Sequence, residues 1–233
     1  MISFVVPAHD EERLLARTLE TLHAAADALG EPYDVTVVDD ASTDATPTIA
    51  LAAGVRVVRV AHRQIARARN AGARASTGDL LIFVDADTLV SVEVLRGSLD
   101  AIRRGAVGGG ALFEFDGPLS PWTIVARPIV RWLMTRLHLA AGCYLYVRRD
   151  HFEAVGGFDE SLFATEEIAL SRALRRRGPV VVLPVVVQTS GRKLRSGSGW
   201  RLLRLIGSLL RRGPAVVRDR RDLDLWYGPR RHD

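Results

Sequence analysis

The sequence predicts an α/β fold in which a mostly parallel sheet carries helices on both faces. Short apolar runs rich in valine alternate with longer segments whose apolar residues recur at helical spacing. The first four apolar runs each end in polar or acidic residues. Because the carboxyl ends of parallel strands meet at one edge of a sheet, these polar groups are expected to gather where α/β proteins bind ligands.

The N-terminal half of the chain supplies four strand–helix pairs. The expected strands are residues 2–6, 35–38, 55–60 and 80–84. The expected helices are residues 11–29, a segment ending at 53, 64–75 and 92–103. Pro7 is expected to end the first strand because it has no N–H to donate. Ser42, Thr43 and Asp44 offer N-caps for the second helix, and Gly78 closes the third.

The C-terminal half is less regular. Strands are expected at residues 106–115, 142–147 and 180–187. Residues 121–139 are expected to be helical, and Thr165 is expected to cap a helix that ends at residue 177. Between these elements, the pair Gly156–Gly157 predicts a turn.

The most informative motif is the apolar run Leu80–Val84, which is followed by Asp85 and Asp87. Such a run is typical of a buried strand, so two carboxylates stand at the ligand-binding edge. Hard oxygen ligands at this place suit Mg²⁺ or Mn²⁺, which in turn bind phosphates. An Asp-x-Asp sequence also occurs by chance as a turn or a helix cap. The remaining motifs decide between these two interpretations.

Charge is distributed unevenly along the chain. The net charge is +5, yet residues 192–231 hold twelve basic and three acidic residues. Leucines and arginines in residues 200–212 recur at the spacing of a basic amphipathic helix. Such a helix either lies on an anionic membrane surface or packs on the rest of the protein, and both alternatives stay open. Nucleic acid is not an expected partner.

Cys143 is the only cysteine, which excludes an intrachain disulfide and a cysteine zinc site. This favours a reducing, cytoplasmic setting. The N-terminus has neither the charged start nor the apolar core of a signal peptide, and no apolar run is long enough to cross a bilayer. We therefore expect a cytoplasmic protein, peripheral on the inner face of the membrane if the basic tail binds lipid.

A series of motifs resembles the family 2 glycosyltransferases, and their order along the chain is also that of the family. The motifs are Val5–Glu12, Val37–Asp44, Ala68–Gly72, Phe83–Asp87, Val155–Glu160 and Thr165–Glu167. The resemblance covers about residues 2–187 and implies the GT-A fold. It also implies that the donor is a nucleotide-diphosphate sugar.

The resemblance implies a nucleotide pocket at the ends of the first two strands. Pro7 and Ala8 would line this pocket, with Glu11 close to the base or the ribose. Asp40 would accept a hydrogen bond from a nucleobase N–H, because a carboxylate is only an acceptor. Its neighbour Asp39 is the weaker candidate and would cap the following loop.

Basic and amide side chains extend the implied donor site. Arg69 or Arg63 would reach the base or the phosphates, or else remain a solvated helix charge. Asn70 would tie its helix to the metal loop. Arg192, in a glycine-containing loop after the last strand, would fold over the diphosphate as a lid, or else begin a basic tail.

The resemblance also assigns the metal and the base. Asp87 would ligate Mn²⁺ or Mg²⁺, and Asp85 would bind ribose or help to hold the metal. Glu167 stands where inverting members carry the aspartate that deprotonates the acceptor, with Glu166 as its substitute. Glutamate reaches one methylene farther, and it serves as a base when burial or a neighbouring acid raises its pKa. Both acids also simply favour a helix N-terminus.

The implied activity is a hexosyltransferase that moves one sugar to a hydroxyl acceptor, with inversion. The Gln-x-x-Arg-Trp motif of processive synthases is missing, which favours a single transfer. The catalytic domain would span residues 1–190, divided near residue 115 into a nucleotide-binding half and an acceptor half. A basic tail at 191–233 would follow, and a lipid-linked acceptor is one option that stays open.

Two other functions are compatible with part of the sequence. A non-catalytic nucleotide-sugar binding module, or a membrane-associated scaffold, fits the substituted Glu167 and the lack of a persuasive third metal ligand. A sugar-phosphate nucleotidyltransferase shares a similar sheet. That alternative is less supported, because such enzymes need a glycine-rich basic loop after the first strand and residues 7–11 are acidic without glycine.

Overall fold

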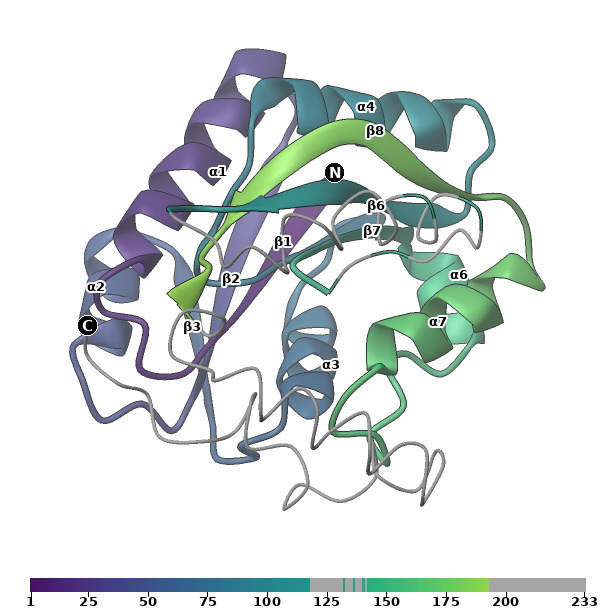
Figure 1. The fold of residues 1–233 in the computed structure, drawn as a ribbon. Helices are drawn as coiled ribbons and strands as arrows, with labels where there is room; N and C mark the ends of the chain where they lie inside the picture. The colour runs from purple at the N-terminus through teal and green to yellow at the C-terminus, as the bar shows by residue number, and fades with distance from the viewer. Residues whose placement is uncertain (118–131, 133–135, 137–139, 141, 193–233) are drawn as a thin grey trace.

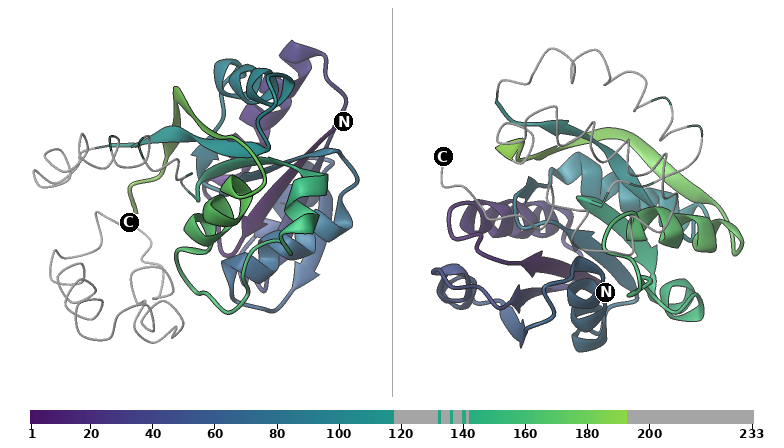
Figure 2. Two further views of the ribbon diagram at one scale, coloured as in Figure 1. Left: turned by 90° about the vertical axis from the view of Figure 1, so that its right-hand side faces the viewer. Right: turned by 60° about the horizontal axis from the view of Figure 1, so that its bottom comes forward.

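The computed structural model describes residues 1–117, 132, 136, 140 and 142–192, which form one eight-stranded mixed sheet with helices on both faces (Figures 1 and 2). The strand order is β3-β2-β1-β4-β7-β6-β8-β5. The strands are β1 (Ile2–Ala8), β2 (Tyr33–Asp40), β3 (Arg56–Val60), β4 (Leu80–Val84), β5 (Thr88–Leu89), β6 (Gly108–Phe115), β7 (Tyr144–Arg148) and β8 (Val180–Thr189). The helices are α1 (Leu15–Leu29), α2 (Thr46–Ala52), α3 (Ile65–Ala75), α4 (Val92–Arg103), α6 (Arg149–Ala154) and α7 (Glu166–Arg175).

The four N-terminal strands of the order, β3-β2-β1-β4, are parallel, as the sequence predicts. The prediction that Pro7 ends β1 is wrong, because the strand continues to Ala8. The carbonyl of Met1 accepts a hydrogen bond from the N–H of Leu80 in β4. The backbone N–H and C=O groups of odd-numbered residues in β1 therefore point toward β4. Pairing with β4 ends at Val5, and the missing N–H of Pro7 therefore breaks no ladder hydrogen bond.

The other half of the sheet is mixed. β7 lies antiparallel between β4 and β6, while β8 runs parallel to β6. The short strand β5, which the sequence analysis did not anticipate, pairs Thr88 with Thr189 and Leu89 with Gln188. Pairing with β5 on one side and with the end of β6 on the other carries β8 two residues beyond the predicted end at 187. It also brings the end of β8 beside the residues that follow β4.

The two faces of the sheet hold separate apolar clusters. Along β4, Leu80, Ile82 and Val84 belong to the cluster that α1, α2 and α4 cover. Leu81 and Phe83 point the opposite way, into the cluster that α3, α6 and α7 cover. Both faces of β4 are buried, which explains its uninterrupted apolar run. The views in Figure 2 show these helix layers on either side of the sheet.

Two predicted segments lie largely or wholly outside the described residues. They are most of the helical stretch at 121–139 and the basic tail after Arg192. Within the described part of the chain, no helix combines the length and the apolar character that a bilayer span requires.

Gly72 of α3 provides a stability test of the packing between α3 and the sheet. A Cβ at this position would lie 2.3 Å from Val5 Cγ1 and 2.8 Å from Val38 Cγ2, both in the centre of the sheet. Overpacking of this kind costs about 1–3 kcal/mol, so we expect Gly72→Ala to lower the free energy of unfolding by that amount in urea titrations. In the matched helical control Gly97→Ala, the nearest atom is the flexible end of Leu183 at 3.3 Å. The control should gain up to about 1 kcal/mol from helix propensity. Equal stability of the two variants would contradict this packing.

Candidate active site

Polar side chains gather at the carboxyl edge of the sheet, as the strand ends predict. The residues directly after β1, β2 and β3 include Asp10, Ala41 and Arg63, and all three have left-handed backbones with φ of 50°, 59° and 46°. Thr165, which precedes α7, has φ of 65°. Non-glycine residues hold this conformation only where the surroundings impose it, and such positions concentrate at functional sites. The edge therefore consists of loops with an imposed geometry.

The first acidic group joins the ends of β1, β4 and β8. Arg192 Nη2 donates to Glu11 Oε2 at 2.5 Å and to Asp87 Oδ2 at 3.3 Å. The other oxygen of Asp87 accepts from Thr189 Oγ1 at 3.4 Å. Glu11 is buried, and its backbone N–H donates to Thr46 Oγ1 at 2.7 Å. Two carboxylates thus face one space, in which the chain's own guanidinium supplies the positive charge.

The second acidic group surrounds Arg69 of α3. This arginine is only 1% exposed. Its Nη1 donates to Glu166 Oε1 at 2.8 Å, and its Nη2 donates to Asp85 Oδ1 at 2.8 Å and to the Gly142 carbonyl at 2.7 Å. The side chain therefore links the turn after β4, the loop before β7 and the start of α7.

Glu167 is adjacent to this group and differs from Glu166 in its surroundings. Glu166 is buried and bound to Arg69, whereas Glu167 is half-buried at the start of α7. Loss of water around Glu167, together with the negative charge of Glu166, raises the pKa of the Glu167 carboxyl to about 8. A carboxyl with this pKa is suited to accept a proton near neutral pH.

The paired acids at the end of β2 support the neighbouring loops. Asp40 accepts from the backbone N–H groups of Arg63 and Gln64, at 2.7 and 3.0 Å. These bonds hold the loop that leads into α3, which begins at Ile65, a role that the sequence analysis did not foresee. Asp39 accepts from the N–H of Ser42 at 3.1 Å, which is the loop-capping role predicted for it. Each oxygen of Asp40 retains a second lone pair for a ligand.

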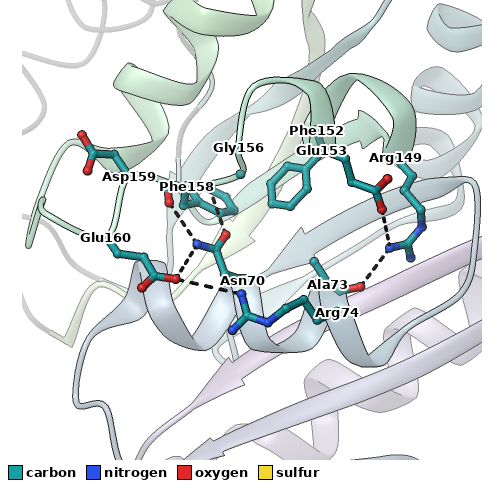
Figure 3. Close-up of a pocket in the computed structure, with 11 residues that line it drawn as sticks. Asn70, Ala73, Arg74, Arg149, Phe152, Glu153, Gly156, Phe158, Asp159 and Glu160 are labelled. Atoms are coloured by element: carbon teal, nitrogen blue, oxygen red, sulfur yellow. Dashed lines mark hydrogen bonds and ion pairs between the residues drawn. The ribbon is translucent and has the colours of Figure 1, made fainter.

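The predicted link between Asn70 and the metal loop is wrong. Asn70 Oδ1 accepts from the Phe158 N–H at 3.0 Å, and its Nδ2 donates to the Phe158 carbonyl at 2.9 Å. Figure 3 shows this amide facing Phe158 and Glu160 beside a pocket of about 540 Å³ between α3 and α6. None of the predicted catalytic, donor or metal residues lines that pocket. Asn70 therefore anchors α3 to the loop that follows the Gly156–Gly157 turn.

The carboxylates of Asp87 and Asp85 are the residues suited to hold a divalent metal. Both are hard oxygen ligands, and the Arg192 guanidinium against Asp87 shows that this position attracts a cation. Among residues 1–117, 132, 136, 140 and 142–192, no group of three or more His, Cys, Asp or Glu side chains has the arrangement of a complete metal site. A metal here would depend on a ligand for further oxygens, as Mg²⁺ commonly does with substrate phosphates.

The mixed sheet with helices on both faces agrees with the GT-A fold that the resemblance implies, and the mannosyltransferase structure described below has a similar fold. Residues 3–156 match the family described as glycosyl transferase family 2, which is more than half of the chain. The chain belongs to this family.

The relatives and structures compared support the same assignment. A validoxylamine A glucosyltransferase from Streptomyces hygroscopicus subsp. jinggangensis is 34% identical over 43% of this chain and 25% of its own length. An undecaprenyl-phosphate 4-deoxy-4-formamido-L-arabinose transferase from Edwardsiella ictaluri is 33% identical over 45% of this chain and 34% of its own. The mannosyltransferase PcManGT from Pyrobaculum calidifontis, in complex with GDP-Man and Mn²⁺, has a TM-score of 0.70 and 22% identity over 88% of this chain and 60% of that one. The matched part of the chain thus spans about a quarter of the length of the validoxylamine A glucosyltransferase and about a third of the length of the arabinose transferase.

Two site residues were missing from the sequence analysis. Gly142 accepts a hydrogen bond from Arg69, and Thr189 donates to Asp87. The Gly142 contact involves a backbone carbonyl, which no side-chain pattern signals. Thr189 could have been found, because it stands at the end of an apolar strand as Asp85 does.

The surroundings of Glu167 lead to a stability prediction that does not depend on function. Its pKa in the folded protein lies above the ordinary carboxyl value, so the folded state keeps a proton that the unfolded state has released. The contribution of Glu167 to stability therefore falls as pH rises from about 4.5 to about 8. We expect Glu167→Gln to raise the melting temperature relative to wild type more at pH 9 than at pH 5, in calorimetric scans. The more exposed control Glu153→Gln should show no such trend, and a pH-independent difference for Glu167→Gln would contradict the assignment.

Proposed function

We propose that this protein transfers a single hexosyl group from a nucleotide-diphosphate sugar to a hydroxyl acceptor, with inversion and with the aid of Mn²⁺ or Mg²⁺. The observation that carries this proposal is the arrangement of the acidic edge. Asp85 follows β4, the helix that bears Glu167 begins beside it, and Arg69 binds both Asp85 and Glu166. The carboxylate proposed to hold the metal, Asp85, and the carboxylate proposed as the base, Glu167, thus lie in one small region of a family 2 glycosyltransferase.

In the proposed reaction, Glu167 accepts the proton of the acceptor hydroxyl. The acceptor oxygen then forms a bond to the anomeric carbon while the bond from that carbon to the diphosphate oxygen breaks. The electron pair of the broken bond leaves with the nucleoside diphosphate. A divalent metal held by Asp87 and Asp85 would neutralise the negative charge on this leaving group. Glu166 is a poorer candidate for the base, because its carboxylate is already bound to Arg69.

The donor would lie across the ends of β1 and β2. Pro7 and Ala8 end β1, Glu11 is buried just beyond them, and Asp40 ends β2. Arg192 already lies close to Glu11 and Asp87, and a guanidinium offers a two-pronged fork to phosphate oxygens. We therefore place Arg192 over the diphosphate of the bound donor. The bound GDP-Man of the similar mannosyltransferase supports a nucleotide-sugar donor.

The acceptor is less defined by the described residues. The undecaprenyl-phosphate transferase among the relatives supports a lipid-linked acceptor, and a protein that uses such an acceptor would work at a membrane surface. In this proposal, residues 1–190 form the catalytic domain and the basic residues after 191 adjoin it.

A non-catalytic sugar-nucleotide binding module is the second candidate. It is favoured by the substitution of glutamate for aspartate at 167 and by the incomplete metal ligand set of the described residues. The two candidates differ in turnover, which the following experiments measure.

A donor screen tests binding and the role of Asp87. Thermal-shift measurements with UDP-, GDP- and TDP-sugars and Mn²⁺ should identify one donor that stabilises the protein, and donor hydrolysis should follow. We expect Asp87→Ala to abolish hydrolysis and to remove the Mn²⁺-dependent part of the shift. The control Asp79→Ala changes an exposed carboxylate that pairs with the N-terminus and should behave as wild type. Binding without turnover by the wild-type protein would favour the binding module.

The pH dependence of turnover tests the base. Only the deprotonated form of Glu167 accepts a proton, so kcat/KM for the selected donor should rise with pH and level off above about 8. Glu167→Gln should lower kcat by roughly 10²–10⁴-fold while calorimetry finds donor affinity unchanged. Normal turnover in this variant would exclude Glu167 as the base. Equal loss in Glu166→Gln and Glu167→Gln, with a shared change in donor affinity, would also contradict the assignment.

A further inference from the structure

Arg69 has an environment that differs from that of a ligand-binding arginine. Its side chain is 1% exposed, and both terminal nitrogens donate to protein acceptors. The Phe158 ring lies 5.3 Å from the guanidinium carbon, which closes a further side. Nε has no hydrogen-bond partner among the described residues. A donor molecule cannot touch Arg69 without displacing these contacts, so the geometry does not support the donor-binding role that the resemblance implied.

The partners of Arg69 come from three separate segments of the chain. Asp85 follows β4, Gly142 lies in the loop before β7, and Glu166 begins α7. Both carboxylates are 2.8 Å from the guanidinium, and Asp85 is 28% exposed while Glu166 is 5% exposed. A planar guanidinium holds several acceptors at fixed directions, which a lysine ammonium does not. Arg69 therefore sets the spacing between the turn that bears Asp85 and the helix that bears Glu167.

Charge balance points to the same role. Asp85, Glu166 and Glu167 all act electrostatically on Arg69, so one cation serves three acids. Arg69 binds Asp85 and Glu166 directly, so Glu167 is the acid of the three that has no hydrogen bond to Arg69 among the described residues. Without Arg69 the two glutamates would repel each other at the start of α7 and lose their common anchor.

We propose that Arg69 is a positioning residue, which fixes Glu167 relative to Asp85 by holding Asp85, Glu166 and the Gly142 carbonyl in one hydrogen-bonded unit. The proposal rests on the proposed function, because it concerns the alignment of the base with the metal-side carboxylate. Arg69 itself touches neither donor nor acceptor. Its loss should reduce the rate of the chemical step and leave donor affinity intact.

Gly142 offers a way to disturb this unit without changing any charge. A Cβ at this position would lie 3.3 Å from Arg69 Nη2 and 3.7 Å from Glu167 Cδ. The distance to Arg69 Nη2 is shorter than an ordinary contact, so the added methyl group would push on the guanidinium, which three acceptors hold, whereas the distance to Glu167 is that of an ordinary contact. Gly142→Ala therefore disturbs the guanidinium that binds both Asp85 and Glu166, and it keeps every ionisable group.

The main experiment uses Arg69→Lys, which keeps the positive charge and removes the fork. The substrate is the nucleotide sugar selected by the donor screen, with Mn²⁺, and turnover is followed as donor hydrolysis. We expect kcat to fall at least tenfold, while the Kd for donor from calorimetry stays within threefold of wild type. A kcat within twofold of wild type would overturn the proposal. A donor Kd that weakens by the same factor as kcat would also overturn it, and would return Arg69 to donor binding.

If Arg69→Lys shows no cooperative unfolding transition, the variant is not properly folded. Two variants that retain Arg69 then test the positioning role. Glu166→Gln and Gly142→Ala should each lower kcat at least tenfold with the donor Kd within threefold, and unchanged kcat in both would overturn the proposal. The double variant Arg69→Lys, Glu166→Gln should lose less than the product of the two single losses, because both changes break one unit. A loss of kcat in the double variant equal to the product of the two single losses would show that the two residues act independently, and would contradict the proposed unit.

A surface arginine supplies the matched control. Arg103 pairs with Glu31 at 2.8 Å and is largely exposed, so Arg103→Lys should leave both kcat and donor affinity unchanged. The two proposals fail in different ways. A wild-type protein that neither binds nor hydrolyses any donor contradicts the proposed function. A wild-type enzyme with equally active Arg69→Lys, Glu166→Gln and Gly142→Ala variants contradicts only the positioning role.

Discussion

The buried ion pairs of Arg69 are the interaction on which the arrangement of the acidic edge depends. They join segments from the parallel and the mixed parts of the sheet, which also meet in the antiparallel pairing of β4 with β7 and in the bonds of Asn70 to Phe158. Removing one partner from a buried ion pair leaves an uncompensated charge, and typical costs are about 3–5 kcal/mol. The requirement is therefore mutual: the carboxylates need the guanidinium in order to be buried, and the guanidinium needs the carboxylates.

Sequence patterns were sufficient to predict the bounds of a strand that is buried on both faces and of a strongly amphipathic helix. The bounds of β4 and α4 agree with their predicted ranges, because both faces of β4 are covered and α4 has a Ser91 cap. β5 was missed because two residues carry no periodicity, and its existence depends on pairing with β8. The end of β1 was misplaced because the tolerance of Pro7 depends on which neighbour the position faces, and this is known only from the register.

The site was predicted as a set of strand ends, but the contacts among its members were not. Arg69 was assigned to donor binding on the strength of a motif, although its position in α3 carried a different signal. It stands three residues after Ala66 and four before Ala73, and both alanines are buried. An arginine on the buried face of a helix must meet acidic or carbonyl partners inside the protein. Helical periodicity, applied to a charged residue, would have indicated that this guanidinium is buried.

The end of β8 fixes the place from which the remaining chain departs. The Ser190 N–H donates to the Asp87 carbonyl at 3.2 Å, and the Gly191 N–H donates to Asp116 Oδ1 at 2.8 Å. These two backbone bonds fix the chain immediately before Arg192, whose guanidinium contacts Glu11 and Asp87. The end of β8 therefore determines where this guanidinium lies as well as where the sheet ends.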